Sequence, residues 1–496
     1  MIDEGQTVPS VLIPGAPRFQ VIPDEVLQRI HGAALEMLVD PGVEIQTEEA
    51  RGLLLAGGCS AVGENVISIP STLVEDSIAS APKTFVVYDR NGEEACRLGE
   101  GRAHFGIGVT SLNYEDPESG EVREFTVGDF ASLARLADAL ENLDFIASPG
   151  VARSTPEMPQ CIVNQREFLA MTTNTTKPIM PLIANANALS DIYEMAAVIA
   201  GGRDQLRERP FVVPYLNSVS PLQFGVETLD KLLLAADWGM PVVCQAAATL
   251  GATGPMSVAG TAALSAAETL AGLVVCQLRR KGTPYLAGSM PMGMDMRSGN
   301  VTGGGAPGSL LYYAGVALGR YWGIPQVGSG GATDSKIPDE QASAEAANSI
   351  FVDIMLGSDM NFDAGAMEAG LTTSATLAVM CDEIIGNTRG IVEGIATDDE
   401  QLAVDVVRRV GIGGLYLGDE HTLRHFREVM PPPLMSWETR LEWEAGGSKT
   451  LRERAREVAV QLISTHETEK LSDGVLAAME EIVLSRKAQA PVEEDD

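Results

Sequence analysis

One short stretch of the chain concentrates side chains that can do chemistry. Residues 328–341 read Gly-Ser-Gly-Gly-Ala-Thr-Asp-Ser-Lys-Ile-Pro-Asp-Glu-Gln, and ionisable groups crowd one part of it: Asp334, Lys336, Asp339 and Glu340. The stretch follows an apolar run at 324–327 that is typical of a buried strand, and it precedes an alanine-rich helical pattern. α/β enzymes hold their active sites at the carboxyl ends of such strands. For any single residue the alternative is a solvated loop with a helix cap.

Further candidate site residues follow other apolar runs, and together they are rich in aromatic, amide and carboxylate groups: Phe105, Tyr114, Asn217, Gln245, Phe362 and Glu368. The sequence has no nucleophile elbow, no phosphate-binding loop and no cysteine–histidine pair with clear spacing. An apolar, aromatic pocket that carries a carboxylate suits a small organic cation, through cation–π contact and charge.

Histidine and cysteine give no clear metal site. His421 and His425 are four residues apart on a predicted helix, a spacing that binds a metal only with a third ligand. The H-x-x-x-H pattern lacks the accompanying carboxylate, so we predict no metal site. The six cysteines are scattered without a C-x-x-C pair, as expected for a reducing cytoplasm.

The elements that position the candidate residues form a repeat. Eight short apolar runs each precede a polar loop and a helical pattern: residues 104–109, 145–151, 178–183, 210–216, 241–247, 284–289, 325–330 and 361–366. Eight strand–helix units predict a (β/α)8 TIM barrel over residues 101–399. The alternative is an open doubly wound sheet. The one G-x-G-x-x-G match, at 303–308, lies too far beyond the sixth run to support that alternative.

Two smaller regions flank the predicted barrel. Residues 1–100 form an expected α+β cap, with helical patterns at 24–38, 48–56 and 71–79 and a strand pair turned by Asn91-Gly92. Residues 400–496 form an expected helical extension, whose patterns include 401–410 and 418–429.

Composition restricts the possible function classes. The 496 residues carry 68 acidic against 35 Lys and Arg side chains, a net charge of −33, and no basic cluster that would bind nucleic acid. The most apolar stretch, residues 258–278, contains Glu268 and is alanine-rich, so we predict a buried helix and no membrane span. The first residues lack a signal-peptide pattern, and we expect a cytoplasmic protein.

Three segments carry a family resemblance: 328–374, 126–145 and the C-terminal His-Thr-Leu-Arg-His-Phe-Arg-Glu at 421–428. They resemble the trimethylamine methyltransferase family. The resemblance implies a (β/α)8 enzyme that moves a methyl group from a methylamine to the cobalt of a separate corrinoid protein. Founding members carry pyrrolysine. This chain has only standard residues and is similar to the non-pyrrolysine branch, whose members demethylate quaternary amines such as betaines.

The implied chemistry agrees with the histidine-poor site. A quaternary ammonium that loses a methyl group leaves as a neutral tertiary amine and needs no acid, so the enzyme supplies positioning and desolvation. We therefore expect roles as follows: Phe105, Tyr114 and Phe362 line the cation site, Asp334 or Glu368 neutralises the charge, and Asn217 and Gln245 hold the polar end of the substrate.

The methyl acceptor is expected on a partner. Residues 419–424 approach the D-x-H-x-x-G signature of a corrinoid module but have Arg424 in place of glycine. The expected partners are thus a cognate corrinoid protein, a small cationic amine and further copies of this chain. Two alternatives stay open. One is another barrel enzyme, a lyase or a folate-type methyltransferase with Asn185 and Asn217 on the pterin, and the other is an amine-binding relative without catalysis.

Overall fold

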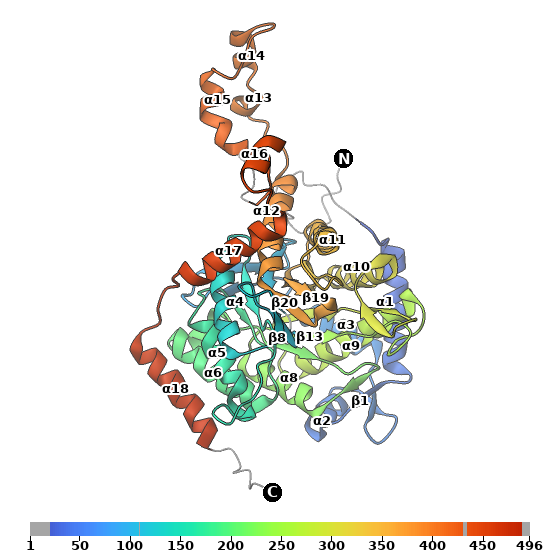
Figure 1. The fold of residues 1–496 in the computed structure, drawn as a ribbon. Helices are drawn as coiled ribbons and strands as arrows, with labels where there is room; N and C mark the ends of the chain where they lie inside the picture. The colour runs from blue at the N-terminus through green and yellow to red at the C-terminus, as the bar shows by residue number, and fades with distance from the viewer. Residues whose placement is uncertain (1–19, 109, 430–433, 489–496) are drawn as a thin grey trace.

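The structure, a computed structural model, describes residues 20–108, 110–429 and 434–488. Within these residues the protein is of the α/β class, with a curled parallel sheet surrounded by helices (Figure 1). Each strand of that sheet overlaps one of the eight predicted runs: β6 (His104–Ile107), β9 (Phe145–Ala147), β10 (Ile179–Met180), β11 (Tyr215–Asn217), β13 (Val242–Ala246), β14 (Tyr285–Ser289), β17 (Val327–Gly328) and β18 (Met360–Ala364).

Backbone pairing runs from strand to strand around the sheet. The order β10-β9-β6-β18-β17 forms one continuous ladder and β11-β13-β14 a second, with parallel pairing throughout. Single parallel bridges join the two ladders, Ile179 to Val212 and Leu182 to Tyr215 on one side and Ala287 to Gln326 on the other. Each of the eight strands in the described residues therefore has a paired neighbour on both sides.

Helices follow the strands and cover the outside of the sheet: α4 (Val127–Ala139), α5 (Val163–Thr172), α6 (Ala186–Ala200), α7 (Arg203–Glu208), α8 (Val226–Trp238), α9 (Val258–Arg279), α10 (Gly305–Trp322), α11 (Glu340–Leu356) and α12 (Ala375–Glu393). Gly239, Gly323 and Gly357 end three of them at positive φ, where glycine has no steric cost. α9 is long and apolar enough to cross a membrane, but 83% of its apolar window is buried among other elements. It is thus a core helix, as predicted.

The amino-terminal segment packs its helices on α9 and α10, and its hairpin seals one end of the sheet. Its elements are α1 (Asp24–Val39), β1 (Val43–Ile45), α2 (Glu48–Ala56), β2 (Ser60–Ala61), β3 (Val66–Ser68), α3 (Ser71–Ser80), β4 (Phe85–Tyr88) and β5 (Glu94–Leu98). The β4–β5 hairpin places Val87, Cys96 and Leu98 in the apolar interior enclosed by the sheet, beside Phe145. Its Tyr88 amide donates to the carbonyl of Pro210, ahead of β11, at 2.8 Å. The hairpin therefore closes the amino-terminal end.

Short strands lie in the loops at the opposite, carboxyl-terminal end of the sheet: β7 (Asn113–Glu115), β8 (Val122–Glu124), β12 (Gln223–Phe224), β15 (Gly293–Asp295), β16 (Asn300–Thr302), β19 (Ala366–Met367) and β20 (Thr372–Ser374). The order β19-β20-β7-β8 joins the loop after β18 to the loop after β6. β12, after β11, pairs with β1 of the amino-terminal segment. The sequence presented all of these segments as loops, because strands of two or three residues are too short to show a period.

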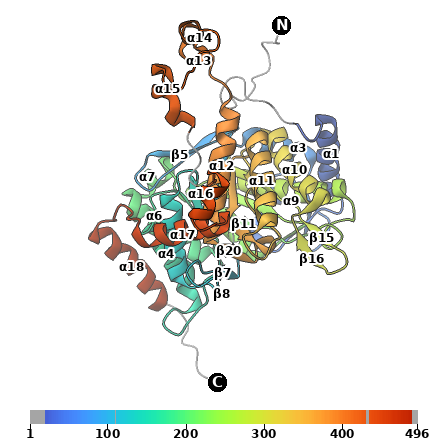
Figure 2. The ribbon, with the colours of Figure 1, turned by 45° about the horizontal axis from the view of Figure 1, so that its top comes forward.

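The carboxyl-terminal region is helical, as predicted: α13 (Asp399–Leu402), α14 (Val404–Val410), α15 (Glu420–His425), α16 (Arg440–Ala445), α17 (Leu451–Thr465) and α18 (Asp473–Ala488). α17 packs on α4 and α12, and α18 packs on α6. α13 to α15 instead stand clear of the body in both ribbon views (Figures 1 and 2). The single helix predicted at 401–410 is wrong in one respect: Ala403, at φ +49°, divides it into α13 and α14.

Candidate functional site

A cavity of about 440 Å3 opens at the carboxyl-terminal end of the sheet. Its walls come from β11, β13 and β18, from the loops after β14 and β17 and from the amino-terminal halves of α10 and α11. The lining includes Tyr215, Gln245, Met290, Met292, Tyr312, Tyr313, Ser329, Asp334, Glu345, Phe362 and Asp363. This is the end at which barrel-like α/β enzymes carry out their chemistry.

Aromatic rings form one wall of the cavity. The rings of Tyr215 and Phe362 meet edge to face, with centroids 5.3 Å apart and planes at 79°. Tyr312 lies near them and accepts a hydrogen bond from the Ser329 amide at 2.6 Å. Ring faces of this kind attract an organic cation through their quadrupoles. Of the three predicted aromatic residues, Phe362 lines this wall, and the cation site itself stays a prediction.

Asp363 places a buried carboxyl against these rings. One of its oxygens accepts from the Ser329 hydroxyl, while Oδ1 has no hydrogen-bond partner among the described residues. Burial raises the pKa of Asp363 to about 7, and the Ser329 hydroxyl offsets that rise only in part. A buried acceptor without a counter-charge is a costly arrangement unless a ligand completes it. Asp363 is therefore the strongest candidate for the group that faces a cation.

A second buried carboxyl is connected to the first. Tyr312 donates its hydroxyl to Asp353 on α11, and burial raises the pKa of Asp353 well above its usual range. Because Tyr312 also binds the Ser329 amide and Ser329 binds Asp363, hydrogen bonds link the two acids. Asp353 lies in a helix and Tyr312 in another, so no local sequence signal marked either residue.

Gln245 offers a polar group on the wall beside β11. Its Oε1 atom is buried and has no hydrogen-bond partner among the described residues. Asn217 is its register partner on β11, but the Asn217 side chain is exposed and does not line the cavity. Gln245 lines the cavity, and its role at the polar end of a substrate stays a prediction, whereas Asn217 lies outside the cavity lining.

Asp334 lines the cavity, but its carboxylate is already occupied. It accepts from the amides of Gly303 at 3.1 Å and Gly304 at 2.9 Å and from the Thr302 hydroxyl. Gly304 is the N-cap of α10, where a negative charge is favoured by the helix dipole. The expected charge-neutralising role of Asp334 is thus corrected to that of an anchor between two loops.

Two of the predicted aromatic residues lie elsewhere. Phe105 faces the surrounding helices, with the Arg389 guanidinium carbon 5.8 Å from its ring centroid, and Tyr114 packs against Phe125 at 5.5 Å. Neither lines the cavity. The assignment of both to the cation site is corrected, because alternate residues of a strand point to opposite faces and Phe105 points outward.

Glu368 also lies outside the cavity lining, and it accepts from the Thr372 hydroxyl at 2.8 Å. Its neighbours Ala369 and Gly370 do line the cavity. Asn185, proposed for a pterin, caps α6 by accepting from the Ala188 amide at 2.9 Å. The residues on which the folate alternative depended are therefore a helix cap and an exposed amide.

Comparison with known proteins identifies the family. Residues 4–491 match the family model described as trimethylamine methyltransferase (MTTB). The chain belongs to this family. It is 34% identical over 466 residues to the trimethylamine methyltransferase MttB of Desulfitobacterium hafniense (strain DSM 10664 / DCB-2), covering 93% of this chain and 92% of the relative.

A second member of the family carries another name. The glycine betaine methyltransferase of Desulfitobacterium hafniense (strain Y51) is 29% identical over 476 residues, covering 95% of this chain and 98% of that protein. Among solved structures, the monomethylamine methyltransferase MtmB of Methanosarcina barkeri aligns with a TM-score of 0.49 and 12% identity, over 90% of this chain and 94% of that one. The predicted family is confirmed, and family membership supports methyltransferase activity.

Proposed function

We propose that this chain transfers a methyl group from a quaternary amine, of the betaine class, to the cobalt of a corrinoid carried by a separate cognate protein. The relatives' names, which include a glycine betaine methyltransferase, support the donor class. The absence of pyrrolysine from the sequence supports it too, because a quaternary ammonium needs no activation before its methyl group is removed. We further propose that the eight strands form a closed (β/α)8 TIM barrel, supported by the bridges that join the two ladders.

One observation carries the donor assignment: a buried carboxyl with an unpartnered oxygen, Asp363, stands beside the rings of Phe362 and Tyr215. A quaternary ammonium has no N–H group to donate. It is recognised by ring faces and by the field of a carboxylate, both of which this wall supplies. Gln245 is placed to hold the polar end of the donor through its amide.

These residues act by positioning. Tyr215 and Phe362 fix the ammonium methyl groups by ring contact, and Asp363 neutralises the charge in a site that excludes water. As the methyl group leaves, the nitrogen loses its charge, so no residue has to protonate the departing tertiary amine. A site without a nearby histidine is sufficient for this chemistry.

The methyl acceptor has to reach the cavity from outside. A corrinoid macrocycle is too large for a volume of about 440 Å3, which supports an acceptor delivered on a partner at the open end. We propose no corrinoid permanently bound to this chain. A cytoplasmic location and an assembly of several copies remain predictions from the sequence.

A methyl-transfer assay tests the proposal. The purified chain, a reduced Co(I) corrinoid protein and glycine betaine are mixed, and the absorbance of the methylated corrinoid is followed together with the dimethylglycine formed. Trimethylamine is tested in parallel, and we expect transfer from the quaternary amine only. Transfer from trimethylamine alone would contradict the donor class. Tight betaine binding without transfer, with several corrinoid partners, would favour the non-catalytic alternative.

A further inference from the structure

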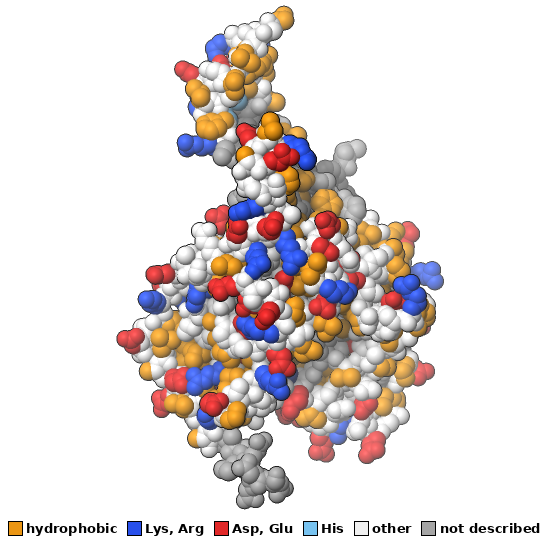
Figure 3. Space-filling model, viewed as in Figure 1, with side chains coloured by type: hydrophobic (Ala, Val, Ile, Leu, Met, Phe, Trp, Pro, Cys, Tyr) orange, Lys and Arg blue, Asp and Glu red, His pale blue; other side chains and the backbone are white. Residues whose placement is uncertain are grey.

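The lobe, residues 395–429 with helices α13 to α15, projects from the body with little core of its own (Figure 2). Among its described side chains, Val406 is the buried apolar residue. Ile412 and Leu415 are fully or largely exposed. Hydrophobic side chains lie on the surface of the projecting lobe (Figure 3). The lobe also contains no cysteine. Units of this size need a disulfide, a metal or a partner in order to hold one conformation.

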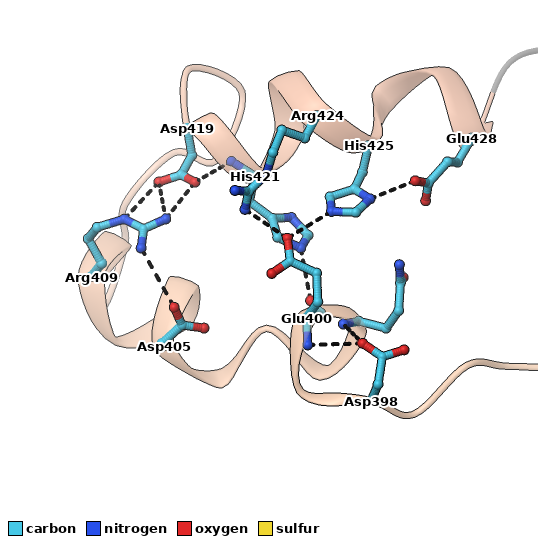
Figure 4. A network of polar contacts seen from close by, with 10 residues as sticks. Asp398, Glu400, Asp405, Arg409, Asp419, His421, Arg424, His425 and Glu428 are labelled. Atoms are coloured by element: carbon cyan, nitrogen blue, oxygen red, sulfur yellow. Dashed lines mark hydrogen bonds and ion pairs between the residues drawn. The ribbon is translucent and has the colours of Figure 1, made fainter.

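Two histidines of the lobe converge on one acidic residue. His421 and His425 lie one turn apart on α15, with ring centroids 4.4 Å apart. The Nε2 atom of His421 is 3.1 Å from the carbonyl oxygen of Glu400, and that of His425 is 3.1 Å from the Glu400 carboxylate (Figure 4). One ligand atom from each of these three side chains lies within 4.8 Å of the others.

We propose that Glu400, His421 and His425 form a binding site for a divalent transition-metal ion of the Zn2+ type. Two imidazoles and one carboxylate are the donor set that such ions prefer, with the fourth position left to water. Zinc holds ligand atoms at about 2.0–2.2 Å, so the three side chains close by small rotations onto the ion. The ion would join α13 to α15. In the chain, α13 ends at Leu402 and α15 begins 18 residues later, at Glu420.

A second carboxylate orients one of the ligands. The Nδ1 atom of His425 is 2.7 Å from Glu428 Oε1, on the side of the ring opposite Glu400. A carboxylate that accepts from Nδ1–H fixes the tautomer in which Nε2 carries a lone pair toward the metal. Metal-binding histidines regularly have such a carboxylate partner on their second ring nitrogen.

The backbone on both sides of the site is held independently of any metal. Asp398 accepts from the Glu400 and Gln401 amides, each at 3.1 Å, and Asp419 accepts from the His421 amide at 2.9 Å. The competing interaction is Arg424, whose guanidinium lies 2.7 Å from Glu400 Oε1. Zinc and Arg424 therefore compete for one carboxylate, and this competition distinguishes a metal site from a network of ion pairs.

The tag-free full-length chain is first stripped of metal with EDTA. Calorimetric titration with Zn2+ then measures the affinity, and the metal content after dialysis measures how much zinc each chain retains. We expect one Zn2+ per chain. His425→Ala and His421→Ala abolish binding, Glu428→Gln weakens it about 10-fold, and Arg424→Gln leaves it equal or tighter. His466→Ala is the matched control, because His466 pairs with Asp138 at 2.7 Å without a second histidine, and it leaves binding unchanged.

Limited proteolysis supplies a second readout. Zn2+ should slow cleavage within the lobe of the parent chain and of the His466→Ala variant, and it should have no effect on His421→Ala. The proposal is overturned if the parent chain retains no zinc. It is equally overturned if the double variant His421→Ala/His425→Ala binds zinc as the parent does, or if Arg424→Gln weakens zinc binding.

Discussion

The two ends of the curled sheet both bury carboxyl groups, but they treat them differently. At the amino-terminal end Asp144 lies 3.6 Å from His104 Nδ1 and 2.6 Å from the Arg389 guanidinium, and it accepts from the Phe105 amide. Burial acts to raise the pKa of Asp144, yet His104, Arg389 and the amide together hold it well below its usual range. The protein itself supplies the counter-charges here.

At the carboxyl-terminal end no such cation accompanies Asp363 among the described residues. Ser329 donates to it, Oδ1 has no hydrogen-bond partner, and burial raises its pKa to about 7. The amino-terminal end, closed by the hairpin, thus uses buried charges to hold elements together. The open, carboxyl-terminal end leaves a buried carboxyl without a counter-charge. The difference indicates that a cationic ligand supplies the counter-charge at the open end. Stability and ligand affinity, measured separately, test this difference in four ways.

The largest expected effect is at the closed end. Asp144→Ala leaves His104 and Arg389 buried without their partner, so the free energy of unfolding should fall by about 3–5 kcal/mol. Urea unfolding measures this loss. Where the variant does not fold, Asp144→Asn keeps the shape and should show a smaller loss with unchanged betaine affinity. A loss below about 1 kcal/mol for Asp144→Ala would remove the contrast between the ends.

The next effect is at the open end. Asp363→Asn removes the charge that faces the cation, and glycine betaine should bind about 100-fold more weakly, equivalent to roughly 3 kcal/mol. Calorimetry measures the dissociation constant. The matched control is Asp359→Asn, because burial raises the pKa of Asp359 to about 6 but this residue lies at the closed end. Equal losses in both variants would argue against a site-specific role for Asp363.

The third effect is on pH. The folded pKa of Asp363, about 7, exceeds the ordinary 3.8, so the folded state binds the extra proton between these values. The stability from this group is present below pH 4 and is lost as the pH rises through 7. A bound cation favours the charged form, so betaine affinity should rise about tenfold per pH unit up to pH 7 and then level off. A flat profile in the parent chain, or a sloping one in Asp363→Asn, would contradict this assignment.

The smallest effect is on the aromatic wall. Phe362→Leu removes a ring face and should weaken betaine binding about 5-fold, or roughly 1 kcal/mol, with a modest cost in stability. Phe105→Leu is the matched control: its ring packs beside Arg389 outside the cavity, so it should lower stability and leave affinity unchanged. If Phe105→Leu weakened betaine binding and Phe362→Leu did not, Phe105 would be the ring that contacts the cation.

Local pattern was sufficient for the eight strands of the curled sheet, but not for the short strands at its carboxyl-terminal end. The eight apolar runs and the Asn91-Gly92 turn follow from the sequence, because strand hydrophobicity and turn chemistry depend on residues a few positions apart. The family resemblance added the reaction class. The cluster of ionisable residues at 334–340 lies at the carboxyl-terminal end of the sheet, where Asp334 lines the cavity.

Only the tertiary structure decided which side chains share a site. Phe105 and Phe362 occupy similar runs, but strands that are apolar on both faces do not reveal which face is the interior. From the sequence, Asp363 is interpreted as a loop cap. The structure shows that one of its carboxyl oxygens has no hydrogen-bond partner among the described residues and that burial raises its pKa. His421 and His425 lacked a third ligand in the sequence, and the fold brings Glu400 to them from 21 and 25 residues away. Sequence determined the eight main strands through short-range chemistry, whereas the fold determined the short strands and the sites through contacts between distant segments.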